Sequence, residues 1–194
     1  MNAPVLDHPQ TLAERLKQET TTLHERLDTS IVGKSPFADT ARYGAFVETQ
    51  YRFYAVIEPL YHDETLGALI PGLASRSRLE AARLDLIDLG RAVPEVAPVE
   101  IPDDARLGWL YVSEGSTLGA AFLLKAVGAL GFNEEKGARH LAASPEGRGK
   151  HWREFKDAIN TVTLTPEQDA AAIAGANAAF AHVQQLVGEV MVPA

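Results

Sequence analysis

The sequence predicts an all-α fold with six or more helices packed around one core. Apolar residues recur at helical spacing in several long segments. No run of alternating β-branched and aromatic residues bounded by turn dipeptides indicates a strand. The chain has 194 residues, of which 46% are hydrophobic and 23% charged, enough for one domain with a sizeable core. We expect a flexible N-terminal arm at residues 1–10 and one helical domain at 11–194.

The first three expected helices have clear start or stop signals. Thr11 followed by Glu14 is a capping box, and one apolar stripe then follows at Leu12, Leu16, Leu23 and Leu27. The second helix runs from Thr40 to about Tyr61 and carries five aromatic residues on or beside its buried face. The third covers 77–89 and stops at Gly90.

The second half of the chain predicts a long central helix and a long C-terminal helix. Residues 91–102 hold three prolines and are expected to form an extended connection. We then expect a helix over about 103–130, a loop over 131–149 and a short helix over 152–159. Thr165-Pro166-Glu167 marks the start of the last helix, which extends to about Val190.

Composition excludes several classes of function. The chain has no cysteine, so disulfides, Cys-ligated zinc, iron–sulfur clusters and thiolate haem ligation are excluded. Its 18 basic and 26 acidic side chains give a net charge of −8, which disfavours nucleic acids and anionic membranes as partners. No secretory signal is evident, which favours the cytoplasm. Metalloprotease, nucleophile-elbow, phosphate-loop and dinucleotide motifs are missing.

His24 has the most informative surroundings of the six histidines. On a helical wheel Lys17, His24 and Asp28 share one flank beside the leucine stripe, with Lys17 and His24 roughly 10 Å apart along the axis. That separation suits a flat ligand with a metal at its centre and carboxylates at its edge. Asp28, one turn after His24, is placed to accept a hydrogen bond from the non-ligating ring nitrogen. An ordinary i,i+4 contact at the border of the core is the alternative.

Gly115 and Gly119 stand one turn apart in the expected central helix. Each costs up to about 1 kcal/mol relative to Ala in a helix interior, so something must offset the cost. One interpretation is close helix packing through small residues, which Ala120 and Ala121 would extend. The other is a bare strip of backbone against which a planar ligand lies, with a kink at the glycines.

Several segments together resemble a known family. LKQETTTLHERLD is similar to the proximal helix of haem oxygenases, and GWLYVSEGSTLGAAFLLK is similar to the glycine-rich distal helix of bacterial members. QYRFYAVIEPLY, LIPGLASRSRLEAARLDLIDLG and GARHL also resemble bacterial members, so the similarity covers about residues 12–185.

The resemblance implies a haem oxygenase that holds haem b (iron protoporphyrin IX) between the first and distal helices. By it, His24 is the proximal iron ligand, Asp28 its hydrogen-bond partner and Lys17 a contact to a haem propionate. Gly115 and Gly119 lie over the distal face. Haem is both cofactor and substrate, and O₂ with external electrons converts it to biliverdin, CO and ferrous iron.

The chain departs from the family pattern at the distal site. Many members carry an aspartate where this chain has Ser116, so a different anchor for ordered water is expected; Arg78 is the candidate by resemblance, with a surface arginine as the alternative. Tyr111 matches an aromatic residue near the pocket of a bacterial subgroup, with plain core packing as the alternative. That subgroup seats the haem in a rotated orientation and uses lysines at the positions of Val32 and Ala126 and an asparagine at the position of Lys17. This chain has none of those three residues. Opening at the α-meso carbon is therefore expected.

Residues 136–156 carry a local charge of +4, which suits an acidic electron donor such as a ferredoxin, although a solvated basic face explains it equally well. A flavin reductase is another expected donor class. Two other functions stay open: a non-catalytic haem-binding or storage protein on the same fold, and a helical interaction module that binds no haem.

Overall fold

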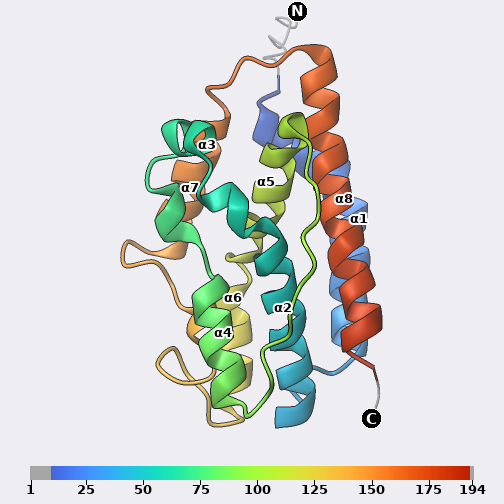
Figure 1. Ribbon diagram of the computed structural model, residues 1–194, viewed down its shortest axis with the longest axis vertical. Helices are drawn as coiled ribbons and strands as arrows, with labels where there is room; N and C mark the ends of the chain where they lie inside the picture. The colour runs from blue at the N-terminus through green and yellow to red at the C-terminus, as the bar shows by residue number, and fades with distance from the viewer. Residues whose placement is uncertain (1–9, 193–194) are drawn as a thin grey trace, which may run out of the picture.

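Helices make up most of the computed structural model, which describes residues 10–192 (Figure 1). Within these residues the α-helices are α1 Leu12–Gly33, α2 Thr40–Tyr61, α3 Glu64–Leu69, α4 Leu79–Asp88, α5 Arg106–Ser116, α6 Ala120–Gly128, α7 Arg148–Ile159 and α8 Pro166–Val190. Short 3₁₀ turns occur at Leu73–Arg76, Asp103–Ala105 and Arg139–Leu141. Between residues 10 and 192 there is no strand, so the all-α prediction is confirmed. The predicted N-terminal arm falls outside the described residues except for Gln10.

The helix boundaries follow the capping signals closely. The Thr11 side chain accepts a hydrogen bond from the Glu14 amide, and the Glu14 carboxylate accepts one from the Thr11 amide at 2.8 Å. A second capping box, with Thr165 and Gln168, starts α8. α7 begins at Arg148, four residues earlier than predicted. Gly147 directly precedes the helix, and Gly149 in its first turn does not interrupt it.

The predicted continuous helix over 103–130 is wrong, because residues 117–119 separate α5 from α6. Backbone hydrogen bonds tighten to the i→i−3 pattern here: the Thr117 amide donates to Glu114 O at 3.3 Å and the Leu118 amide to Gly115 O at 3.1 Å. The apolar pattern runs through this stretch without a proline, so the local signal for an interruption is the glycine pair, at which a kink is expected. The break falls between the two glycines Gly115 and Gly119.

Close contact between α5 and α8 forms the centre of the core. A methyl group added at Gly108 would lie 2.0 Å from the Ala172 carbonyl oxygen, and one added at Gly175 would lie 2.2 Å from the Ala105 carbonyl oxygen. The two backbones therefore touch, which only glycine permits. Trp109, which is 5% exposed, fills the space beside this crossing, as the sequence predicts.

α8 also packs along α1, and the two run side by side at one edge of the molecule (Figure 1). The chain after α4 passes beside α2, where Arg91 forms an ion pair with Glu48 at 2.6 Å, before it reaches α5. None of the helices within residues 10–192 is both long and apolar enough to cross a membrane.

Candidate functional site

His24 and Asp28 form a pair on the open side of α1. His24 Nδ1 lies 3.1 Å from Asp28 Oδ2, and the two side chains are 60% and 62% exposed. Within residues 10–192 no hydrogen-bond partner engages Nε2. A carboxylate beside Nδ1 favours the tautomer that carries its proton on Nδ1 and leaves the Nε2 lone pair for a metal. The contact expected from the helical spacing is therefore present.

The rest of this flank is also open. The His24 ring meets the Phe180 ring of α8 edge-on, with ring centroids 5.9 Å apart, so that one side of the imidazole packs against the protein. Lys17, two turns earlier, is exposed and pairs with no carboxylate among residues 10–192. The lysine ammonium is thus available to an anion at the edge of a ligand.

Gly115 and Gly119 are not needed for close helix packing. A methyl group at Gly115 would lie 3.6 Å from Trp152 Cη2, and one at Gly119 would lie 3.9 Å from Ser116 O, both ordinary contacts. Helix packing against backbone occurs at Gly108 and Gly175 instead. Of the two interpretations of this pair, the packing one does not match the structure, whereas a bare strip beside a helix break does.

Ser116 and Thr117 both turn their hydroxyl protons toward the backbone. Ser116 Oγ donates to Ser113 O at 2.6 Å, and Thr117 Oγ1 donates to Glu114 O at 2.7 Å. These bonds occupy carbonyls that the break has released from regular helical bonding. Toward a ligand the exposed Ser116 hydroxyl therefore offers lone pairs and no proton.

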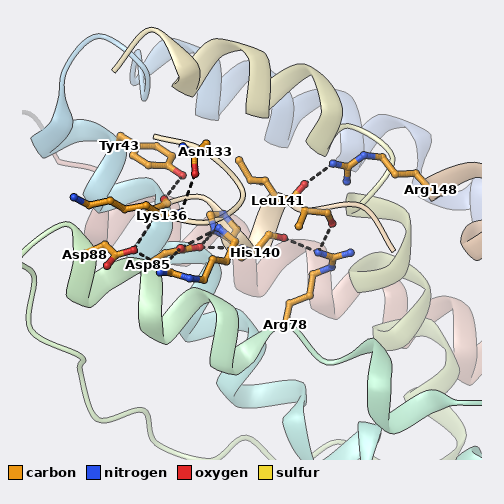
Figure 2. Close-up of polar contacts among 12 residues, drawn as sticks. Tyr43, Arg78, Asp85, Asp88, Asn133, Lys136, His140, Leu141 and Arg148 are labelled. Atoms are coloured by element: carbon orange, nitrogen blue, oxygen red, sulfur yellow. Dashed lines mark hydrogen bonds and ion pairs between the residues drawn. The ribbon is translucent and has the colours of Figure 1, made fainter. Parts of the chain in front are cut away.

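Arg78 is half-buried beside this region. Its Nη1 donates to His140 O at 2.8 Å and to Ala142 O at 2.9 Å (Figure 2). Burial raises the pKa of Tyr54, while the Arg78 charge and the Ser116 hydroxyl act to lower it. The side chain is thus held by two backbone carbonyls, and its role at the site stays a prediction.

The aromatic rings of Tyr111 and Trp152 pack together beside Gly115. Tyr111 is 9% exposed, and its ring centroid lies 5.4 Å from that of Trp152. Burial raises the pKa of the Tyr111 hydroxyl. Trp152 stacks on Phe155 and carries the Lys156 ammonium 5.7 Å from its ring centroid. Tyr111 and Trp152 are therefore both packed against other side chains, and Trp152 also lies next to Gly115.

A buried charged cluster next to Gly115 escaped the sequence analysis. The Glu114 carboxylate accepts hydrogen bonds from Arg76 Nη1 at 2.9 Å and Tyr61 Oη at 3.0 Å, and His151 Nε2 lies 3.3 Å away. Glu114 is 1% exposed and Arg76 7%. The partners come from three distant segments, so no local spacing marks them; the one signal is a carboxylate inside an apolar helix. The cluster fixes α5 beside the break.

His140 is buried together with Asp85. Its Nδ1 lies 2.7 Å from Asp85 Oδ2, and its amide donates to the same oxygen at 2.9 Å (Figure 2). Burial raises the pKa of Asp85, but the hydrogen bonds and charge of His140 outweigh it, so the pKa is lowered overall. The pair ties the Arg139–Leu141 turn to α4.

Two of the six basic side chains of residues 136–156 form ion pairs within residues 10–192. Arg139 pairs with Asp85 and Asp88, and Lys150 pairs with Glu146 and Glu154. Glu146 and Glu154 are already counted in the local charge of +4, so it is the pairing of Arg139 that reduces the positive charge left for an acidic partner.

The fold and the site define a helical protein that presents an exposed, carboxylate-supported histidine on one helix and a bare backbone strip at the break of another. Known proteins are similar to this chain over nearly its whole length. A family model described as heme oxygenase matches residues 10–189.

Individual relatives agree with this family match. Heme oxygenase PigA of Pseudomonas aeruginosa is 45% identical over 172 residues, 87% of each chain. A heme oxygenase of Xanthomonas campestris pv. campestris is 30% identical over 150 residues, 74% of this chain and 87% of that one. The NO- and CO-bound heme oxygenase of Neisseria meningitidis superposes with a TM-score of 0.88 at 41% identity, covering 93% and 92% of the two chains. The chain belongs to the haem oxygenase family, whose members are enzymes that degrade haem.

Proposed function

We propose that this protein binds haem b and, with O₂ and electrons from an external donor, cleaves it at the α-meso carbon to biliverdin, CO and ferrous iron. The observation that carries the proposal is the exposed His24–Asp28 pair together with the vacant strip at Gly115 and Gly119. A single histidine suits haem, because one imidazole is enough to hold haem iron from its proximal side. When bound, haem supplies the iron that activates O₂ and is itself the molecule that is cleaved.

The proximal residues orient the ligand. Asp28, 3.1 Å from His24 Nδ1, would hold the ring in the tautomer that leaves Nε2 to bind the haem iron. The ammonium of Lys17 pairs with a carboxylate at the haem edge, which fixes the rotation of the macrocycle about the ligand bond.

The distal residues shape the other face. At Gly115 and Gly119 the missing side chains let a flat ligand approach the backbone. Ser116 and Thr117 donate their protons inward, so the hydroxyl exposed at this face accepts a hydrogen bond from water and supplies no acid. Arg78 contributes positive charge beside Tyr54 and Ser116 and takes the anchoring role of the aspartate found in many relatives. Tyr111 packs against Trp152, which in turn lies next to Gly115.

The finer features of the function belong to the same proposal. One helical domain over 11–194 carries the whole site, and the protein works in the cytoplasm. A ferredoxin or a flavin reductase delivers the electrons, with Lys136, which is exposed and forms no ion pair within residues 10–192, as a basic contact for an acidic donor.

Reconstitution with haem tests the proposal. The purified protein with one equivalent of haem should lose its Soret band and gain bilin absorption when ascorbate or a ferredoxin with its reductase is added, while His24→Ala should not. A Soret band that persists without bilin would identify a haem-storage protein, and no haem binding would identify an interaction module.

A further inference from the structure

Arg148, the first residue of α7, contacts two segments that are distant in the sequence. Its Nη1 donates to Thr117 O at 3.2 Å, inside the break between α5 and α6, and its Nη2 donates to Leu141 O in the Arg139–Leu141 turn (Figure 2 shows the second contact). A planar guanidinium holds two acceptors in a fixed geometry, which an ammonium does not. One side chain thus links the break to the turn.

The carbonyl that Arg148 binds is one that the break disturbs. In a regular helix Thr117 O would accept the amide of residue 121, but here it accepts the Ala120 amide at 3.3 Å in the tighter pattern. The Ser116 and Thr117 hydroxyls bond neighbouring carbonyls from within the same segment. Arg148 is therefore a side chain from outside this segment that binds the backbone of the break directly.

The turn at the other end of this link is firmly held. Arg78 binds His140 O and Ala142 O, and Arg148 binds the carbonyl of Leu141 between them. The buried pair of His140 and Asp85 fastens the turn to α4. The turn is thus a rigid support for a bond that reaches the distal strip.

The position of Arg148 is unfavourable for stability alone. A cation in the first turn opposes the helix dipole. Burial and the charge of Arg78 lower the pKa of Arg148, and Glu134 opposes them. The guanidinium groups of Arg78 and Arg148 lie in the same region, and the acceptors that they bind are neutral backbone carbonyls rather than carboxylates. Such an arrangement points to a role in holding the break rather than in global stability.

We propose that Arg148 is a positioning residue for haem cleavage: it holds the α5–α6 break so that Gly115 and Gly119 face the macrocycle in one orientation. This inference rests on the proposed function. Loosening the break would let the strip shift along the ligand, so the cleavage would lose its preference for one meso carbon.

The test compares Arg148→Ala and Arg148→Lys with Arg153→Ala, an exposed arginine of the same helix that forms no hydrogen bond or ion pair within residues 10–192. In the haem-free proteins, hydrogen–deuterium exchange of residues 117–123 should be about tenfold faster in both Arg148 variants and unchanged in the control. With haem, both Arg148 variants should give mixed biliverdin isomers and an altered Soret circular dichroism. Arg148→Lys should behave like Arg148→Ala, because it keeps the charge but not the two-carbonyl contact.

Unchanged exchange at residues 117–123 would overturn the inference, and so would faster exchange with a wild-type isomer pattern. If Arg148→Ala fails to fold, as thermal melting would show, Arg148→Lys decides by the same measurements. Failure of the proposed function would appear in the wild type as haem that is bound but not converted; exchange and Soret circular dichroism of the ferric complex then decide on Arg148.

Discussion

Replacing Gly115 by Ala should make the haem-free protein more stable and should lower the affinity of the protein for haem. The added methyl group lies 3.6 Å from Trp152 Cη2, an ordinary contact, so the fold accommodates it. Alanine is favoured over glycine in a helix by up to about 1 kcal/mol, which raises the melting temperature by about 2–4 °C in a chain of this size. Because haem is proposed to lie against the backbone at Gly115, the added methyl group should also hold the ligand away from that backbone. A cost of about 1–3 kcal/mol would lower haem affinity about 5- to 150-fold.

Gly108→Ala is the matched control on the same helix. Its methyl group would lie 2.0 Å from the Ala172 carbonyl oxygen, so the backbones of α5 and α8 must separate. The expected cost is about 1–3 kcal/mol or more, seen as a lower melting temperature. Thermal melting of the haem-free variants and haem titration followed in the Soret band measure both effects. A destabilised Gly115→Ala variant with wild-type haem affinity would refute the assignment of this glycine to the ligand site.

Other variants test the remaining parts of the site and the fold. Glu114→Gln leaves Arg76, with a side chain 5% exposed, without a buried counter-charge and should lower the free energy of unfolding by about 3–5 kcal/mol in urea titrations; a loss below about 1 kcal/mol would contradict this. His24→Ala removes a side chain 60% exposed, so melting of the haem-free protein should be unchanged while the ferric haem spectrum changes; identical spectra would exclude His24 as the ligand. Burial lowers the pKa of His182, opposed by Glu189, so the unfolded state binds the proton first and stability should fall as the pH drops below about 6.5; urea titrations from pH 7 to 5 should show this loss in wild type and less of it in His182→Gln.

The sequence predicted the elements whose signals are local. The capping box at Thr11 located the start of α1, and the Thr165-Pro166 signal located α8 to the residue. The contact between His24 and Asp28 also follows from helical spacing alone, because both residues lie on one helix. Where one helix carries the whole pattern, the geometry of the helix is sufficient.

Features that depend on distant residues were not predictable in the same way. The break at 117–119 is held partly by Arg148, about 30 residues later in the chain, so the glycines within 103–130 indicate a kink without showing that the helix ends there. His140 is buried because Asp85, 55 residues earlier, supplies its partner. Gly108 and Gly175 are required by a contact between two helices rather than by a local turn. Tertiary contacts decide all three, and each lies in or beside the core that supports the site.

Chromatographic identification of the bilin formed in a single turnover tests the central claim most directly. Haem-loaded protein supplied with O₂ and a ferredoxin system should release CO and give biliverdin opened at the α-meso carbon as its main product. Haem that keeps its Soret band under these conditions would contradict the claim that this protein cleaves haem. A β or δ isomer as the main product would contradict the role assigned to Lys17 in orienting the macrocycle.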